Sequence, residues 1–371
     1  MRIAVSLAFV QWAFAASAFV LAQSQGLTPE KRGQIASTVT RFMDASSVPG
    51  ISVAVVQNGK PVWSEGFGVA DKENYVPATS STLYRLGSIS KSITAIAVLQ
   101  LSEQGKLDLD APAQKYCPVF PQKEAPITAR QLLGHLGGIR HYNPDGKGDV
   151  PEDSAKHFAT MEESLQLFAA DPLVAKPGAE FHYSTYGYTL LGCMLEGATS
   201  RKFVDYLREN VFQPARMDQT QADDFFSVVP HRTRWYHKDK SGVVRNAGVL
   251  DSSYKIPGGG LISSADDMAN FEAAMLADKL VKHVTRDLMW SIEKTTAGKP
   301  PHYGLGWDIR DRFGLRTVGH DGGQQGTTTG MIIVPEKSAG VVVLANMDSL
   351  DLNRLAEEIL RIVLDVKDKM R

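Results

Sequence analysis

Residues 84–107, YRLGSISKSITAIAVLQLSEQGKL, place a serine and a lysine at the start of a long apolar helix. Ser88 follows Gly87 directly, and Lys91 stands one helical turn later, ahead of an apolar run. Lysine is almost never fully buried without a partner. Lys91 is therefore either a solvated residue at a helix start or a residue held near Ser88 for its chemistry. Because residues three apart share a helix face, the Lys91 amine can reach the Ser88 hydroxyl.

That pairing would suit nucleophilic catalysis. A serine hydroxyl becomes a good nucleophile when a base removes its proton. Lysine can be that base only as the neutral amine, which partial burial favours by lowering the pKa. Ser-x-x-Lys occurs at three places in the chain: Ser88/Lys91, Ser252/Lys255 and Ser291/Lys294. The second copy runs into a proline- and glycine-rich stretch that we expect not to continue a helix, and the third soon meets Thr, Gly and Pro. Only the first opens a long helix.

Outward from this helix, β-rich runs lie towards both ends of the chain. A capped amphipathic helix is expected near residues 29–45, followed by two strands joined by the hairpin signal Asn58-Gly59. Residues 315–346 read as strand, loop, strand, tight turn and strand, and a last helix is expected from Leu352 to about Val366. Short helical pieces and loops lie between, without long strands. We therefore predict an α+β fold, an antiparallel sheet flanked by helices with an inserted, mostly helical lobe.

The predicted boundaries follow from these patterns. Residues 1–22 read as a secretory signal peptide, because Arg2 precedes an apolar, alanine-rich run and Val20-Leu21-Ala22 suits cleavage. A retained membrane anchor is the alternative reading. Residues 23–371 then form one domain, with a sheet lobe from about 28–105 and 261–371 and a helical lobe of about 106–260. We expect an exported protein, periplasmic or secreted, that meets a membrane only if the first segment is retained.

Composition excludes several classes of protein. The chain has 371 residues and a formal charge of −1, so no basic field points to nucleic acid. Its two cysteines, Cys117 and Cys193, are too few for a disulfide scaffold, and we take both as buried and structural, with their pairing open. The histidines show no metal-ligand spacing, so neither a metal nor a cofactor is predicted.

Two further segments carry polar residues in suggestive places. FHYSTYGYTLLG, residues 181–192, sets Tyr183 and Thr185 on a polar loop ahead of an apolar helix. VGHDGGQQGTTTG, residues 318–330, sets His320, Gly322 and Gly323 at an expected strand end, in a glycine-rich turn where amides could face a ligand. Taken singly, Tyr183 is more readily core packing and His320 an ordinary loop histidine.

Taken together and in this order, the three segments resemble the serine β-lactamase and penicillin-binding-protein superfamily. That superfamily uses Ser-x-x-Lys, Tyr-x-Asn, and Lys-Thr-Gly or His-x-Gly. The class C β-lactamase-like hydrolases are similar, and the mitochondrial β-lactamase-like branch, which includes a peptidase, is more similar still. The resemblance covers nearly the whole mature chain and extends to LLGHLGGIRHY (132–142) and SSYKIPGGGLISSADDMANF (252–271). It implies a β-lactamase/transpeptidase-like fold.

The resemblance also implies roles. Ser88 would be the nucleophile, Lys91 its base, and Tyr183 the residue that passes a proton to the leaving group. The amides of Ser88 and Gly323 would form the oxyanion hole, worth about 10²–10³ in rate. His320, Gly322 and Thr185 would help to bind and orient the substrate.

Three departures from the family pattern affect these expectations. Thr185 replaces the usual asparagine and so loses an amide group. His320 replaces lysine, and its reference pKa of about 6.5 leads us to expect partial charge near neutrality and pH-sensitive substrate binding. HLGG at residues 135–138 stands where HTSG is usual.

We therefore expect a serine hydrolase that acts through an acyl-enzyme on a small peptide, amide or ester substrate. Peptidase or amidase ranks first, carboxylesterase second and weak β-lactamase third. A non-catalytic peptidoglycan- or peptide-binding scaffold is the alternative of another class. No residue fixes the oligomeric state.

Overall fold

The computed structural model describes residues 26–143, 146–151 and 154–366. The predicted signal segment, residues 1–22, lies outside this part of the chain. Within the described part, no helix combines the length and the apolar character needed to cross a membrane.

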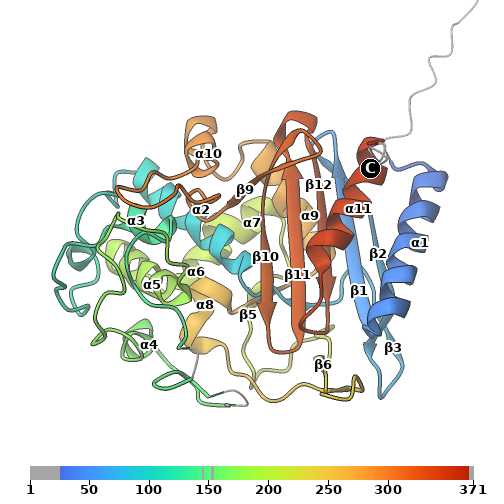
Figure 1. Ribbon diagram of the computed structural model, residues 1–371, viewed down its shortest axis with the longest axis horizontal. Coiled ribbons are helices and arrows are strands. Elements are labelled where there is room, and N and C mark those ends of the chain that lie inside the picture. Colours follow the sequence, from blue (N-terminus) through green and yellow to red (C-terminus); the bar gives the residue numbers. More distant parts are fainter. Residues whose placement is uncertain (1–25, 144–145, 152–153, 367–371) are drawn as a thin grey trace, which may run out of the picture.

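A seven-stranded antiparallel sheet forms the centre of the fold (Figure 1). Its spatial order is β3-β2-β1-β12-β11-β10-β9, so strands from both ends of the chain meet where β1 pairs with β12. The strands are β1 (Gly50–Gln57), β2 (Lys60–Asp71), β3 (Val76–Pro77), β9 (Asp308–Arg312), β10 (Leu315–Gln324), β11 (Thr327–Val334) and β12 (Ala339–Ala345). The predicted α+β class and antiparallel sheet are confirmed.

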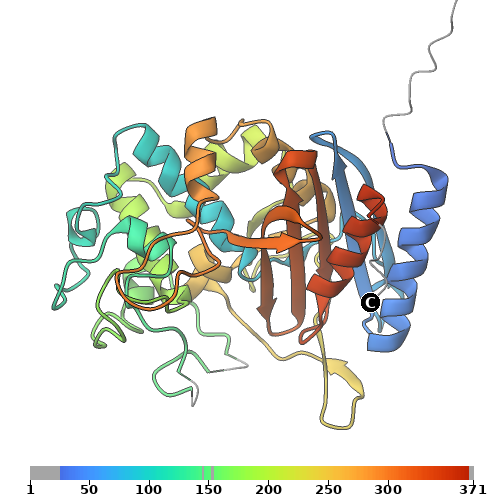
Figure 2. The ribbon, with the colours of Figure 1, turned by 45° about the horizontal axis from the view of Figure 1, so that its top comes forward.

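Helices cover both faces of this sheet. The helices α1 (Pro29–Ser46) and α11 (Leu352–Leu364) pack together on one face, while α9 (Ala265–Leu276) packs on the other (Figures 1 and 2). Alternate residues of β1 face opposite sides of the sheet. Val53 and Val55 join the apolar cluster under α1 and α11. Ala54 and Val56 join the larger cluster on the other side.

Local sequence signals account for the predicted elements at the two ends of the chain. Thr28 accepts a hydrogen bond from the Lys31 amide at 3.2 Å, and Pro29 occupies the first turn of α1. Asn58 and Gly59 both adopt positive φ, 53° and 69°, as the tight turn between β1 and β2 requires. Asp351 caps α11 through the Arg354 amide.

Between the first strands and α9 the regular structure is mostly helical, in short helices joined by long loops (Figure 2). Its central element is α2 (Ile89–Glu103), which contacts β10 and β11 of the sheet as well as α5 and α8. The other helices of this region and the one that follows α9 are α3 (Ala129–Leu133), α4 (Met161–Leu165), α5 (Thr185–Thr199), α6 (Phe203–Leu207), α7 (Gln213–Ala215), α8 (Ile256–Gly259) and α10 (His283–Met289). Single turns of 3₁₀ or π geometry are η1 (Ala113–Lys115), η2 (Arg208–Phe212), η3 (Ser253–Lys255) and η4 (Pro335–Lys337).

The remaining strands have two or three residues each. They form two small sheets, β4-β8-β5 and β6-β7. Their bounds are β4 (Tyr84–Arg85), β5 (Gln221–Ala222), β6 (Tyr236–Lys238), β7 (Val244–Asn246) and β8 (Leu261–Ser263). This agrees with the expectation that residues 107–260 contain no long strand.

Two local predictions need correction. The glycine-rich turn expected after His320 is strand, because β10 continues to Gln324 and pairs Gly322 with Thr329. A side chain at position 322 would lie 2.1 Å from the Leu86 carbonyl, so glycine here allows close approach rather than a turn. The stretch after Lys255 does form one helical turn, α8, because Pro257 lies in the first turn, where no amide donor is needed.

A disulfide joins Cys117 to Cys193 and so ties the segment after η1 to α5. Cys117 is fully buried and Cys193 partly buried. The pairing that the sequence left open is thereby resolved.

Candidate active site

Ser88 lies at the junction of the sheet and the helical region, just before the first residue of α2. A serine in this position usually caps a helix through its side chain, but Ser88 makes no such hydrogen bond. Its hydroxyl oxygen instead lies 3.0 Å from Lys91 Nζ. The helix therefore positions Ser88 while leaving its hydroxyl for another partner.

Gly87 brings this serine against strand β10. It adopts φ +52°, and a Cβ there would lie 2.9 Å from the Gly323 amide nitrogen and 3.2 Å from Gly322 Cα. Thr329 holds the same segment by donating to the Leu86 carbonyl at 2.8 Å. The amide of Gly323 thus lies beside the segment that carries Ser88.

Lys91 is fully buried. Its Nζ lies 2.6 Å from the Gly258 carbonyl oxygen and 3.1 Å from Thr185 Oγ1, besides its contact with Ser88. Burial holds the pKa of Lys91 well below its usual range, the nearby charge of Lys255 lowers it further, and Asp321 opposes them. In the neutral amine two N–H groups satisfy the carbonyl and the threonine, and the lone pair faces the serine hydroxyl.

Tyr183 lies on the other side of this pair. The centroid of its ring is 4.8 Å from Lys91 Nζ, and Ser88 is near enough to the phenol to influence its pKa. Burial raises the pKa of Tyr183 above its usual value, and the influence of Ser88 offsets only part of that rise. The phenol is therefore protonated at neutral pH.

Two histidines that the sequence analysis did not select hold Tyr183 in place. The ring of His135 lies 4.2 Å from the Tyr183 ring, and the ring of His141 meets it edge-on at 5.4 Å. Their Nδ1 atoms accept the amides of Ser184 at 3.1 Å and Thr185 at 3.3 Å, respectively. Burial lowers the pKa of both, that of His141 to about 4, so both rings are neutral acceptors. The only sequence signal for them was the stretch LLGHLGGIRHY.

His320 is oriented by the protein itself. Its Nδ1 donates to the Asp321 carbonyl at 2.6 Å, and its Nε2 lies 2.8 Å from the Tyr303 hydroxyl. Its pKa is lowered, chiefly by burial, while Asp321 raises it and Lys91 lowers it further. His320 is thus neutral near pH 7, and not partly charged as its reference pKa had suggested, because desolvation disfavours the imidazolium ion.

Ser88 and Tyr183 line two different cavities. Ser88, Thr185 and Gly323 line a cavity of about 630 Å³ whose walls include His141 and Lys255. Tyr183 and His320 line a second cavity of about 390 Å³, together with Tyr303 and Asp321. The sequence-predicted residues therefore lie close together, but they line two different cavities.

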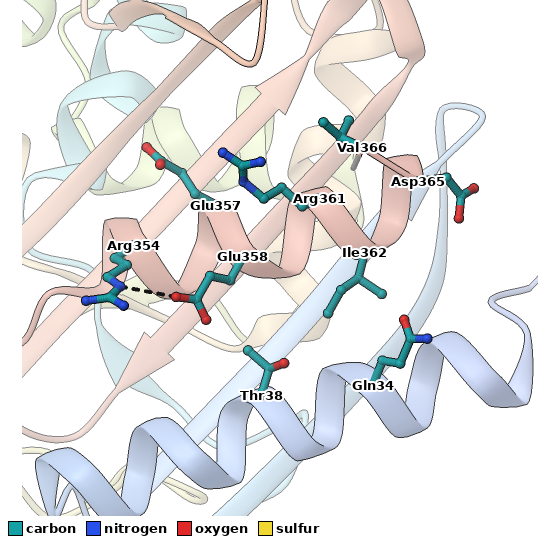
Figure 3. A pocket seen from close by; sticks show the side chains of 9 residues that line it. All are labelled: Gln34, Thr38, Arg354, Glu357, Glu358, Arg361, Ile362, Asp365 and Val366. Atoms are coloured by element: carbon teal, nitrogen blue, oxygen red, sulfur yellow. Dashed lines mark hydrogen bonds and ion pairs between the residues drawn. The ribbon is translucent and has the colours of Figure 1, made fainter. Parts of the chain in front are cut away.

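A larger hollow, of about 700 Å³, lies between α1 and α11 (Figure 3). It is on the face of the sheet opposite α2, and its side chains include the Arg354–Glu358 ion pair. None of the candidate site residues lines it. Its size therefore does not make it the candidate active site.

Comparison with known proteins places this geometry in a family. A beta-lactamase family model matches residues 35–364. The human serine beta-lactamase-like protein LACTB, mitochondrial, is 32% identical over 86% of this chain and 77% of the relative. Protein flp of Staphylococcus aureus is 26% identical over 90% of this chain and 66% of its own.

Solved structures are also similar to this chain. The octameric penicillin-binding protein homologue from Pyrococcus abyssi has a TM-score of 0.77 and 30% identity, covering 90% of this chain and 77% of its own. D-amino acid amidase from Ochrobactrum anthropi, at 24% identity and a TM-score of 0.76 over 91% of this chain and 99% of its own, shares the fold. The chain therefore belongs to the beta-lactamase family, as a serine hydrolase of the β-lactamase-like type.

Proposed function

We propose that the protein hydrolyses an amide or peptide bond of a small substrate through an acyl-enzyme on Ser88. The observation that carries this proposal is the contact of 3.0 Å between Ser88 Oγ and a fully buried lysine amine. No carboxylate forms an ion pair with Lys91 among the residues that the structure describes. A buried lysine without an acid is held neutral, and a neutral amine can accept the serine proton.

In the proposed acylation step, Ser88 Oγ forms a bond to the substrate carbonyl carbon while its proton passes to Lys91 Nζ. The carbonyl becomes an oxyanion, which the amides of Ser88 and Gly323 would stabilise. The bond to the leaving nitrogen or oxygen then breaks, and that atom takes a proton from the Tyr183 phenol, which is replenished from Lys91. In deacylation, water adds to the ester carbon and passes a proton to the Lys91–Tyr183 pair. The bond between that carbon and Ser88 Oγ then breaks, Ser88 Oγ takes up the proton, and the acid product leaves.

We assign positioning roles to His320 and Gly322. His320 is hydrogen-bonded to Tyr303 and lines the cavity next to Tyr183, so we assign it to the leaving-group side. Gly322 allows β10 to approach the Leu86 carbonyl, which keeps Gly323 in place. Thr185 accepts from Lys91 and begins α5.

The ranking of substrates follows the departures at positions 185 and 320. An amidase or peptidase comes first, a carboxylesterase second and a weak β-lactamase third. Some proteins of the same fold are described as a D-stereospecific amidohydrolase and as a hydrolase with promiscuous acyltransferase activity, at identities that speak for the fold alone. Removal of residues 1–22 and export remain part of the proposal.

The test is the mass of the intact protein after treatment with a fluorophosphonate. Wild type should gain one adduct, Ser88→Ala none, and Lys91→Met should react at least about 100-fold more slowly. Labelled wild type should then be compared on peptides, esters and penicillins. A folded wild type without an adduct, also towards a smaller acylating ester, would contradict the proposal and favour a binding scaffold.

A further inference from the structure

A second lysine lies in the cavity that contains Ser88. Lys255 is only 5% exposed and lines the cavity of about 630 Å³ at the end of η3. Its ammonium lies 5.3 Å from the ring of Tyr254 and 5.8 Å from that of Tyr142. The stem passes Gly259, where an added Cβ would lie 3.7 Å from Lys255 Cδ.

This ammonium has no acidic partner within the described part of the chain. Asp223 is the acid that acts on it, but its carboxylate is bound by Arg85 Nε at 2.7 Å, and both side chains are fully buried. Among the described residues that line the same cavity, the acid is Asp149, and it is held by Arg140 at 2.7 Å and by the Tyr186 hydroxyl at 2.7 Å. A nearly buried ammonium that lacks a counter-ion is expensive unless a ligand supplies one.

The pKa of Lys255 agrees with that view. Burial and the charge of Arg85 lower the pKa of Lys255 to about 7, with Asp223 opposing them. An anion that binds beside the ammonium would restore its charged form.

Gln324 adds an unpartnered amide in the same cavity. Its Oε1 and Nε2 are both buried and neither makes a hydrogen bond. The oxygen lies 3.8 Å from the position of a Gly259 Cβ, the same point that Lys255 Cδ approaches. Because buried polar groups are rarely left unpaired, one polar ligand could satisfy both the amide and the ammonium.

The residues that line the two cavities indicate which half of the substrate would carry the group that binds Lys255. Tyr183, the proposed proton donor to the leaving group, lines the cavity with His320. Ser88 and Gly323 line the cavity with Lys255. The leaving group therefore departs on the His320 side, and the acyl portion lies beside Lys255.

We infer that Lys255, assisted by Gln324, selects substrates whose acyl portion carries an anionic substituent such as a carboxylate. This inference rests on the proposed function, because it takes Ser88 and Tyr183 in the roles given above. Lys255 is here a specificity-determining residue and not a base.

The experiment compares two esters that differ in one charge. In mono-p-nitrophenyl adipate the acyl portion ends in a carboxylate, and in p-nitrophenyl methyl adipate that carboxylate is a methyl ester. Wild type should prefer the anionic ester in kcat/KM, and Lys255→Met should lower the anionic-to-neutral ratio at least about tenfold, mainly through KM. Using the ratio cancels any change in the Lys91 pKa that both substrates share.

Two variants control the result. Lys240→Met removes an exposed lysine on the β6–β7 turn and should leave the ratio unchanged. Lys255→Arg keeps the cation and should retain part of the preference. An unchanged ratio in a Lys255→Met protein that still takes up the fluorophosphonate would overturn the inference.

Binding to Ser88→Ala separates this inference from the proposed function. The variant should bind the anionic ester more tightly than the neutral one, and addition of Lys255→Met should abolish the difference. If wild type forms no acyl-enzyme but this preference persists, the proposed chemistry fails and the anion subsite stands. If Ser88→Ala binds both esters equally, the subsite is wrong.

Discussion

The Lys91 amine is surrounded by a carbonyl, two hydroxyls and an aromatic ring. The charged groups that act on it are Lys255, which lowers its pKa, and Asp321, which raises it. Burial is the largest contribution. The residue is thereby kept in the state in which a lysine can accept a proton.

This environment predicts a particular pH profile. The rate should rise with pH as Lys91 loses its proton, so kcat/KM has an acid limb governed by its depressed pKa. Lys255→Met removes a positive charge that lowers this pKa, so the acid limb should move to higher pH. The measurement is kcat/KM of the neutral ester between pH 4 and 9. A limb that stays in place or moves to lower pH would show that Lys255 does not act on Lys91.

Glu272 is a second buried titratable residue, and it takes no part in the proposed chemistry. It lies on α9 with both carboxyl oxygens buried and unbonded, one of them 2.4 Å from where a Gly340 Cβ would be. Burial raises the pKa of Glu272 well above its usual value. The folded protein therefore keeps a proton there that the unfolded chain releases above about pH 4.5.

Replacing Glu272 should thus stabilise the protein in a pH-dependent way. Because the folded state binds the extra proton, wild-type stability falls as pH rises from about 4.5 towards the folded pKa, by up to about 1.4 kcal/mol per pH unit. Glu272→Met should remove this slope and be more stable than wild type at pH 8. Urea unfolding at pH 5 and pH 8 measures the difference, and Glu272→Gln separates the loss of the proton from the loss of the polar group. Equal stability differences at the two pH values would contradict the prediction.

At the scale of elements, the decisive contact is between the start of α2 and strand β10. Gly87 permits it in two ways, through its positive φ and through the absence of a side chain against Gly323. The helix start and the strand then present the Ser88 and Gly323 segments to one side of the same cavity. A small change at this contact should therefore affect catalysis more than folding.

Gly87→Ala tests this contact, and Gly105→Ala is its matched control. Both glycines have positive φ, +52° and +67°, but a Cβ at Gly105 would meet nothing within 4 Å. Each variant should lose about 1–2 kcal/mol of unfolding free energy from backbone strain. Only Gly87→Ala should also react with the fluorophosphonate at least about tenfold more slowly, because it displaces the Gly323 amide. Equal labelling rates in the two variants would argue against an oxyanion role for this contact.

At the scale of the whole molecule, one large apolar core spans the sheet and the helical region. It includes Val318 and Met331 from the sheet, Ile93 and Ile96 from α2, and Leu190 from α5. The helical region therefore shares its core with the sheet, which itself needs strands from both ends of the chain. A second, smaller apolar cluster lies under α1 and α11 on the other face of the sheet.

The shared core predicts cooperative unfolding. Scanning calorimetry should give a single transition, with a calorimetric enthalpy equal to the van't Hoff enthalpy. Fluorescence of Trp290 and Trp307, both in this core, should follow the same curve as far-ultraviolet circular dichroism. Two separated transitions would show that the helical region unfolds independently.

The elements with local signals could be predicted from the amino-acid sequence alone. The caps and apolar periodicity of α1 and α11, the Asn58-Gly59 hairpin and the helix after Ser88 all depend on residues within one or two turns. The closeness of Ser88 and Lys91 could be predicted in the same way, because helical spacing places the two residues on one face. Tyr183 and Gly323 came only from the resemblance to a family.

Features that depend on neighbours distant in the chain emerge only in the folded protein. The strand character of His320–Gly323, the neutral ring of His320, the Cys117–Cys193 bond and the support of Tyr183 by His135 and His141 all arise from such contacts. Lys255 is the clearest case, because its Ser-x-x-Lys spacing was set aside on local grounds. It reaches the Ser88 cavity because α8 packs on α2 and η3 packs on α5. The contact between Lys91 and Gly258 joins segments more than 160 residues apart.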